Sequence, residues 1–256
     1  MSVLEARRLA YAVDEAVLVD GVDLRAEPGE LLGIVGPNGA GKSTLIRLLS
    51  GELPPTGGEV LIGGRSLRHY RPRDLALLRS VLPQQTVLQF AFRVREVVGM
   101  GRYPHRHSSA AEDLASVAEA MDRVEVTHLA DRLYPTLSGG EQTRTSIARV
   151  LAQDGPALLL DEPTASLDIR HQELVMGVLS DLRSAGVGVI AVLHDLNLAA
   201  RYADRVGLMD QGRMVALGLP EEVLRADLLT EVYAYPVAVE QHPLLDCPLI
   251  LPLRSS

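Results

Sequence analysis

The stretch GPNGAGKS at residues 36–43 combines glycines, a lysine and a serine at a spacing suited to binding phosphate. It lies between LLGIV (31–35), a continuous apolar run typical of a buried strand, and LIRLLSG (45–51), which has a helical period. Glycines let backbone N–H groups converge on phosphate oxygens, and the helix directs its positive end at them. The predicted phosphate-binding residues are Gly36, Pro37, Asn38, Gly39, Ala40, Gly41, Lys42, Ser43 and Thr44.

Lys42 is the single lysine among 25 Lys and Arg residues. Every other one of these residues is an arginine. This indicates that position 42 needs a compact ammonium rather than a planar guanidinium. We expect Lys42 to bridge the β- and γ-phosphates of a nucleotide, and the Ser43 hydroxyl to ligate Mg²⁺. The alternative is a glycine-rich turn with a chance lysine, which the strand-before and helix-after context disfavours.

Two carboxylates and a histidine follow other apolar runs. LLLDEP (158–163) reads as a buried strand ending in acids, and VIAVL (189–193) is followed by His194. Ligands of parallel sheets bind at the carboxyl ends of the strands. Asp161 is therefore predicted to hold Mg²⁺ through its water shell, and Glu162 to polarise a water for attack on the γ-phosphate. His194 would contact the γ-phosphate and hold that water in line; the alternatives are solvated acids and a structural histidine.

Weaker candidates are a tyrosine, a histidine pair and a cysteine. Tyr11 stacks on an adenine ring or packs as an ordinary strand residue; the sequence leaves both open. His105 and His107 supply too few ligands for a metal site. Cys247 is the only cysteine, so we expect neither a disulfide nor a cysteine-based metal site.

The order of predicted elements indicates an α/β fold. The first thirty residues alternate apolar and polar, as antiparallel strands do, and later strands alternate with helices, which favours a mostly parallel sheet covered on both faces. Apolar residues recur at helical spacing at positions 114, 117, 121 and 124. This pattern indicates an inserted helical subdomain at 86–153. The nucleotide-binding core with its β subdomain would be 1–85 and 154–256, with a hairpin at 205–218 and an irregular tail after about 233.

TLSGGEQTRTSIARVLAQ (136–153) begins a helix in an unusual way. Ser138 and Glu141 have the spacing of a capping box, yet Gly139 and Gly140 stand between them. Paired glycines at a helix N-terminus suit the close approach of an anion. The chain thus carries a second candidate phosphate cradle, without a lysine, about a hundred residues after the first.

Composition narrows the class of partner. The 256 residues are 47% apolar, with a net charge of −8 and no basic block, which argues against nucleic acid as the main partner. No apolar run has the length of a signal peptide or a membrane span. We expect a cytosolic chain that would rely on a separate subunit for any membrane process.

The motifs GPNGAGKS, SVLPQ, LSGGE, LLLDE, SLD and LHD have the order and spacing seen in ABC-type ATPases. The chain therefore resembles, over essentially its whole length, the nucleotide-binding subunits of ABC transporters. The resemblance implies a P-loop NTPase (RecA-like) core with an N-terminal antiparallel β subdomain and an inserted helical subdomain. It also implies ATP and Mg²⁺ as cofactors, and a head-to-tail dimer in which each ATP lies between one chain's phosphate loop and the other's signature motif.

Further roles come from the resemblance alone. Gln84 resembles the glutamine that senses Mg²⁺ and the γ-phosphate and couples to the membrane subunit, although the adjacent Gln85 also fits. The signature departs from the common pattern at Glu141 and Thr143, where glutamines are more usual, while Arg144 keeps the expected arginine. The residues that would face nucleotide from across the dimer interface are Ser138, Gly139, Gly140, Ser166 and Asp168.

Within the family, the chain is most similar to ATPases of importers for iron chelates, haem and cobalamin. VREVVGMGRYPHR (94–106), DIRHQ (168–172) and HPLLDCPLILP (242–252) resemble hemin-import ATPases. The expected partners are a second copy, a transmembrane permease dimer and a substrate-binding protein, with the chain peripheral to the cytoplasmic face of the membrane. Alternatives are siderophore or cobalamin cargo, or a non-transport ABC ATPase; an unrelated phosphate-loop kinase or GTPase leaves LSGGE unexplained.

Overall fold

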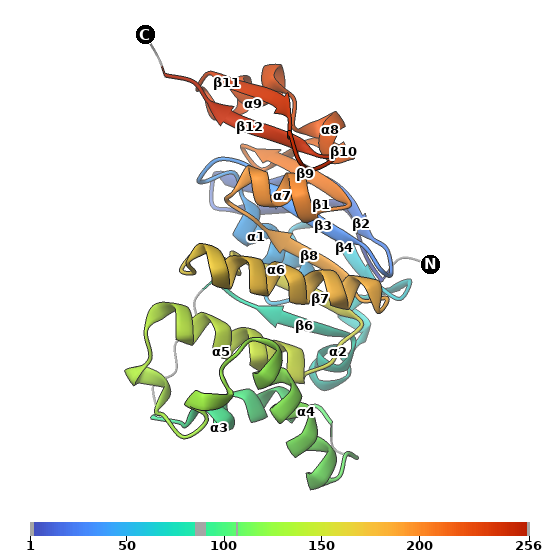
Figure 1. The fold of residues 1–256 in the computed structure, drawn as a ribbon. Coiled ribbons are helices and arrows are strands. Elements are labelled where there is room, and N and C mark those ends of the chain that lie inside the picture. Colours follow the sequence, from blue (N-terminus) through green and yellow to red (C-terminus); the bar gives the residue numbers. More distant parts are fainter. Residues whose placement is uncertain (1–2, 85–90, 106, 255–256) are drawn as a thin grey trace.

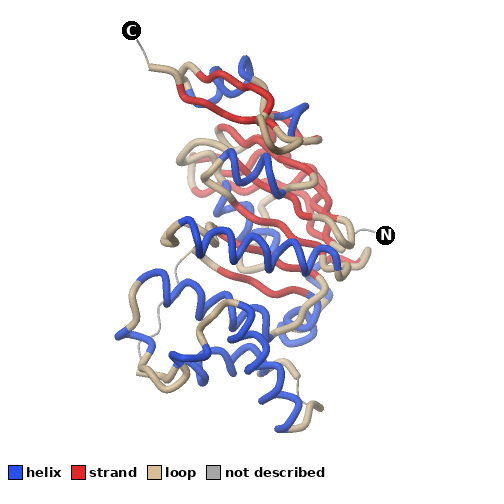
Figure 2. The backbone as a smooth tube through the Cα atoms, in the orientation of Figure 1, coloured by secondary structure: helices blue, strands red, loops and turns tan. Residues whose placement is uncertain are grey.

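A six-stranded sheet forms the centre of the computed structural model, which describes residues 3–84, 91–105 and 107–254 (Figures 1 and 2). Five neighbouring strands are parallel, and the edge strand β10 is antiparallel to β9. The order across the sheet is β10 (Arg213–Gly218), β9 (Arg205–Asp210), β3 (Leu31–Val35), β8 (Gly188–Val192), β7 (Ala157–Asp161) and β6 (Arg79–Leu82).

Successive side chains of the buried strands point to opposite faces of the sheet, so the strands contribute to two separate cores. Leu31, Leu158 and Val189 belong to a core shared with α5 (Gly139–Ala152), α6 (Ile169–Ser184) and α7 (Leu196–Tyr202). Leu32 and Leu159 point to the other face and pack with α1 (Lys42–Ser50) and the N-terminal strands. Because both faces are covered, the strands are continuous apolar runs, as the sequence predicted.

The N-terminal strands form the predicted antiparallel sheet. Its order is β2 (Ala16–Ala26), β1 (Leu4–Val13), β4 (Gly57–Ile62) and β5 (Arg65–Ser66). A short 3-10 helix η1 (Leu67–His69) and α2 (Pro72–Leu78) lead from it to β6. This sheet lies against the face of the central sheet that α1 covers, so it encloses the helix that follows the phosphate loop.

The helices α3 (Val94–Gly99), α4 (Ala110–Arg123) and α5 (Gly139–Ala152) pack on one another beside β6, at the end of the molecule opposite the chain's C-terminus (Figure 1). Short 3-10 helices η2 (Met100–Arg102), η3 (Thr127–Leu129) and η4 (Tyr134–Thr136) connect them. Met121 and Val124 are buried as predicted, but Leu114 is 71% exposed, so the apolar face is shorter than its periodicity suggested. The proposed boundary at residue 86 falls outside the described residues.

The C-terminal segment corrects the prediction of an irregular tail. After α8 (Pro220–Val223) and α9 (Ala226–Tyr233), the chain forms a hairpin of β11 (Val237–Gln241) and β12 (Pro248–Pro252). Pro248 and Pro252 lie four residues apart at the two ends of β12, in the same alternating set of positions as Ile250. Because alternate residues direct their backbone groups away from the partner strand, prolines at that period remove no ladder hydrogen bond. The prolines suggested irregularity, yet a two-stranded ribbon accommodates them.

In the described part of the chain, no helix combines the length and apolarity needed to cross a bilayer.

Candidate functional site

The loop between β3 and α1 has the backbone of a phosphate cradle. Gly36 and Gly41 have φ of 147° and 95°, in the region that favours glycine. A Cβ on Gly36 would lie 2.1 Å from the Met209 carbonyl oxygen, and one on Gly41 would lie 2.4 Å from that of Leu18. The path of the loop therefore requires glycine at both positions.

Lys42 lies against this loop. Its Nζ donates hydrogen bonds to the carbonyls of Gly36 (2.7 Å) and Pro37 (2.8 Å), using two of the three donors of the ammonium. The residue is only 6% exposed, and burial lowers the pKa of Lys42 against the opposing charges of Glu162 and Asp161. An ammonium held this way suits a phosphate oxygen as a further acceptor.

The first turn of α1 is open to an anion. Gly41 is its N-cap, and no described side chain caps it, whereas the Ser138 side chain caps α5. N–H groups in an uncapped first turn need partners and attract negative charge. A cavity of about 640 Å³ lies over this turn. It is lined by Leu18, Asn38, Gly39, Ala40, Gly41, Lys42, Ser43, Thr44, Gln84, Glu162 and His194.

Asp161 and Glu162 lie at the carboxyl end of β7, and Glu162 lines this cavity. Ser43 Oγ donates to Asp161 Oδ1 at 3.2 Å, so two of the three residues predicted to hold Mg²⁺ are adjacent. Asp161 is 4% exposed, and burial raises the pKa of its carboxyl. Hydroxyl and carboxylate oxygens are the hard ligands that Mg²⁺ prefers, so this donor set fits the ion.

Glu162 is oriented by two neighbours. Its Oε1 lies 2.6 Å from His194 Nε2 and accepts a hydrogen bond from Gln84 Nε2 at 3.1 Å. Its backbone has a φ of 56°, which is rare for a residue with a side chain and concentrates at functional sites. Gln84 thus contacts Glu162, and its role toward Mg²⁺ and the γ-phosphate stays a prediction. The alternative, Gln85, lies outside the described residues.

The second cradle has the predicted capping box. The Ser138 side chain accepts from the Glu141 N–H (3.4 Å), while Glu141 Oε2 accepts from the Ser138 N–H at 2.8 Å. The N–H and the hydroxyl of Ser138 both donate to Glu141 Oε2, and these two bonds hold the pKa of Glu141 below its usual value. Ser138, Gly139 and Gly140 are absent from the described lining of the cavity over Lys42. Within one chain, the two cradles therefore do not form a common site.

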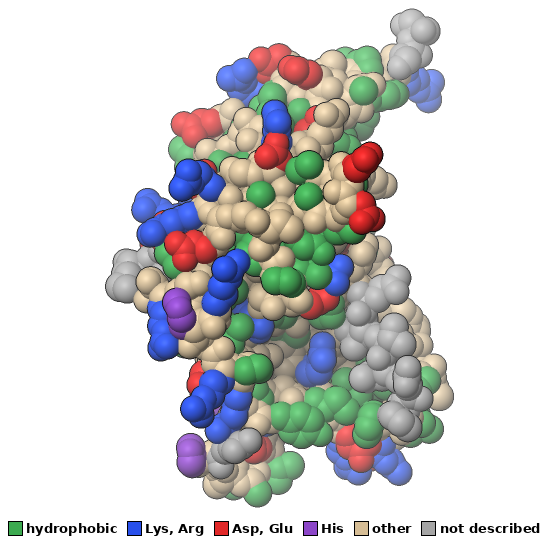
Figure 3. All heavy atoms as spheres, turned by 180° about the vertical axis from the view of Figure 1, so that it is seen from behind, with side chains coloured by type: hydrophobic (Ala, Val, Ile, Leu, Met, Phe, Trp, Pro, Cys, Tyr) green, Lys and Arg blue, Asp and Glu red, His purple; other side chains and the backbone are tan. Residues whose placement is uncertain are grey.

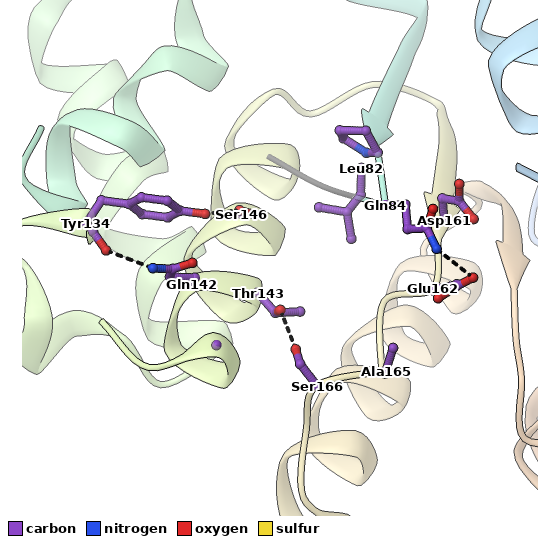
Figure 4. A pocket seen from close by; sticks show the side chains of 12 residues that line it. Leu82, Gln84, Tyr134, Gln142, Thr143, Ser146, Asp161, Glu162, Ala165 and Ser166 are labelled. Atoms are coloured by element: carbon purple, nitrogen blue, oxygen red, sulfur yellow. Dashed lines mark hydrogen bonds between the residues drawn. The ribbon is translucent and has the colours of Figure 1, made fainter. Parts of the chain in front are cut away.

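A second cavity, of about 370 Å³, lies between α5 and the carboxyl end of β7 (Figure 4). It shares Gln84 and Glu162 with the cavity over Lys42 and is also lined by Gly139. Gln84 and Glu162 stand on one side and Gln142 on the other, while Thr143 and Ser166 share a 2.6 Å hydrogen bond across it. The sequence singled out both residues but not their contact, since Thr143 stood out only as a departure from the usual signature.

The remaining candidates occupy defined positions. Asp168 caps α6 by accepting from the His171 N–H at 2.9 Å. Tyr11 is half-buried in β1 and packs on the core around α1. It is not among the described residues lining the cavity over Lys42, so adenine stacking stays a prediction. His105 Nε2 lies 2.8 Å from the Gln153 carbonyl oxygen.

Comparisons with known proteins agree on one family. Residues 19–165 match the ABC transporter family. The hemin import ATP-binding protein HmuV of Nocardia farcinica is 52% identical over 93% of this chain and 83% of its own length. HmuV of Gloeobacter violaceus is 49% identical over 93% and 90%, and HmuV of Pseudomonas aeruginosa is 46% identical over 97% and 99%.

Solved structures extend the likeness to the fold. A chain of a metal-chelate type ABC transporter in an inward-facing conformation has a TM-score of 0.83 and 27% identity, with 99% of this chain and 98% of that chain covered. A dimeric ATP-binding cassette bound to ADP and phosphate in a post-hydrolysis state has a TM-score of 0.78 and 28% identity, with 85% and 98% covered.

A glycine loop leads from β3 into an uncapped helix, and two acids lie at the end of β7, which is separated from β3 by β8 in the same parallel sheet. This arrangement defines a phosphate-loop nucleotide-binding protein. The family match and the relatives then narrow that class, and the chain belongs to the ABC transporter family.

Proposed function

We propose that this chain is the ATP-hydrolysing subunit of a haem importer and works as a head-to-tail dimer on a membrane permease dimer. The observation that carries the cargo assignment is the group of relatives at 46–52% identity, each named a hemin import ATP-binding protein. The metal-chelate type of the structural neighbour also favours a chelated-metal cargo. A substrate-binding protein completes the complex, and the chain is peripheral to the cytoplasmic face of the membrane.

The site residues divide the work of hydrolysis. The loop at 36–44 and Lys42 bind the phosphates of ATP; Tyr11 stacks on adenine, and Ser138, Gly139, Gly140, Ser166 and Asp168 close the site from the partner chain. Ser43 and Asp161, with Gln84, hold Mg²⁺, which neutralises charge between the phosphates. Glu162 accepts the proton of the attacking water. His194 and Gln84 keep its carboxylate aimed, because both meet the same oxygen, Oε1.

We propose that the chain divides into two functional parts, according to which residues bind the nucleotide and which present the signature. The core and β subdomain (1–85 and 154–256) hold the nucleotide, and the helical subdomain (86–153) presents the signature to the partner. On the face in Figure 3, acidic side chains lie among the basic ones. Together with the net charge of −8, this supports a protein partner rather than nucleic acid.

Uptake into vesicles tests the cargo. Vesicles carrying the chain with its cognate permease and binding protein should take up haem when ATP is supplied, and haem should raise ATPase activity. A ferric siderophore and cobalamin serve as matched cargoes. If either is taken up and haem is not, the haem assignment is wrong. If none is taken up while ATP is hydrolysed, a non-transport role gains support.

We propose that residues 94–106, in the segment after Gln84, dock the permease; Arg106 lies outside the described residues. A Cβ on Gly101 would lie 2.2 Å from the Arg149 carbonyl oxygen, and Arg102 donates to the Ala152 carbonyl at 2.9 Å. This part of the backbone is therefore fixed on α5. Tyr103, between anchored neighbours, is 77% exposed and projects outward. An exposed aromatic on a fixed backbone suits a binding anchor.

Replacing this tyrosine should uncouple the chain from its permease. In Tyr103→Ala we expect permease binding about tenfold to thirtyfold weaker, because buried aromatic anchors dominate interfaces. ATPase activity of the isolated chain should not change. Leu114→Ala, which removes another exposed apolar side chain of the helical subdomain, is the matched control. Equal loss of binding in both variants, or none in Tyr103→Ala, contradicts a docking role for this tyrosine.

A further inference from the structure

The C-terminal hairpin is joined to α7 by one asparagine. Asn197 Oδ1 accepts from the Ile250 N–H at 2.8 Å, and Asn197 Nδ2 donates to the Ile250 carbonyl at 3.2 Å. Both backbone groups of Ile250 thus point away from β11, although Ile250 is the register partner of Val239. The asparagine amide therefore pairs with the free edge of β12 as a neighbouring strand would.

Asn197 lies in the first turn of α7, three residues after His194. The N-cap of this helix is Asp195, which accepts from the N–H groups of Asn197 (2.8 Å) and Leu198 (3.3 Å). The cap is thus already supplied, and the Asn197 side chain is used for the hairpin instead. Its contact fixes the turn that immediately follows His194.

The helix needs such external support. It has only seven residues, well below the about 12–15 at which isolated helices become even marginally stable in water. Leu198 packs into the core, which holds one side of the first turn. The paired hydrogen bonds to Ile250, itself 4% exposed, hold the other side in a fixed geometry. Removing them frees the start of α7 without removing its core contacts.

The same C-terminal segment also reaches the phosphate loop. Tyr233, the last residue of α9, lies beside the backbone of Gly36. Burial raises the pKa of its phenol to about 12 and outweighs the Gly36 backbone, which lowers this pKa. Figure 1 shows this segment beside α7 and β9, at the end of the molecule away from the signature helix α5. One segment therefore contacts both the start of the phosphate loop and the helix behind His194.

We propose that the C-terminal segment 219–254 positions the hydrolytic site. Asn197 is the positioning residue, because its hydrogen bonds to the hairpin restrain the turn that follows His194. This inference rests on the proposed ATPase function. The backbone at His194 is fixed from the C-terminal side by Asn197 and Ile250, so its imidazole meets Glu162 at 2.6 Å in a constant orientation. The segment that the sequence marked as irregular is in this account part of the machinery that aims the attacking water.

Steady-state hydrolysis by the full chain tests the proposal. Asn197→Ala should lower kcat roughly tenfold, less than loss of a general base would, and leave the affinity for ATP unchanged. Asn197→Asp keeps the acceptor for the Ile250 N–H and loses the donor, so it should restore part of that loss. The decisive arm repeats Asn197→Ala in a His194→Ala background, where it should cause no further loss, because its effect passes through His194.

Thr230→Val is the matched control. The Thr230 hydroxyl accepts from the Val237 N–H at 3.1 Å, so this change weakens the hairpin's attachment to α9 without touching α7. It should alter kcat less than Asn197→Ala does at a comparable loss of thermal stability.

Three outcomes overturn the positioning role. They are an unchanged kcat in folded Asn197→Ala, an equal loss of activity with and without His194, and an equal loss in Thr230→Val. Failure of the unmodified chain to hydrolyse ATP would instead contradict the proposed function, so the two failures are distinguishable.

Discussion

Glu162→Gln is expected to bind ATP and form the closed dimer but to hydrolyse ATP about 10²- to 10⁴-fold more slowly. The amide is nearly isosteric with the carboxylate. The variant therefore keeps an oxygen or a nitrogen at the position of Oε1, where His194 and Gln84 make their contacts. An amide, however, does not accept a proton from water at neutral pH. Single-turnover kinetics on ATP-loaded protein separates this loss from any change in binding.

The binding measurement matters because Glu162 also acts on Lys42. Burial lowers the pKa of Lys42, and the Glu162 charge opposes that lowering. The variant removes part of this opposition, so ATP affinity is determined separately, at neutral pH.

Glu112→Gln controls for loss of a carboxylate elsewhere. Glu112 Oε2 accepts from the Ser109 N–H at 2.6 Å in the capping box of α4, outside the site. It should hydrolyse ATP at the normal rate. Full turnover in Glu162→Gln would remove this residue as the base.

The parts of the site that the sequence predicted well are those whose chemistry is local. A phosphate loop is one continuous segment, and its glycine, lysine and serine spacing is set by backbone geometry. The capping box of Ser138 and Glu141 is likewise a matter of one helical turn, and the structure has it. The positions of the central strands were also predicted from local sequence, because strands buried on both faces must be apolar throughout.

Contacts between distant segments were harder to predict. Thr143 and Ser166 are 23 positions apart, and a hydroxyl pair leaves no periodic signal. Asn197 and Ile250 are 53 positions apart, and the hairpin that joins them was itself hidden by its prolines. The prediction for Leu114 was wrong although its signal is local. Helical periodicity identifies the apolar face of a helix, but it does not show whether another element covers that face.

The separation of the two cradles within one chain leads to the second large prediction. Lys42→Ala should abolish hydrolysis by removing the buried ammonium from the phosphates, and Ser138→Arg should do so by filling the second cradle with a long side chain. When the two variants are mixed and dimerise, each mixed dimer should carry both lesions in one site and none in the other. Activity should then return to about a quarter of the normal value, as random pairing in a two-fold dimer predicts.

Two further mixtures make this result decisive. Lys42→Ala mixed with Glu162→Gln places one lesion in each site of every mixed dimer, so no activity should return. Lys42→Ala mixed with the unmodified chain leaves one intact site and shows whether a single site can turn over alone. If that dimer is active and the Ser138→Arg mixture is not, although mixed dimers form, the two cradles do not complete one another. If recovery appears only where Lys42 and Ser138 are intact on opposite chains, the second cradle lacks a lysine because it closes over the lysine of its partner.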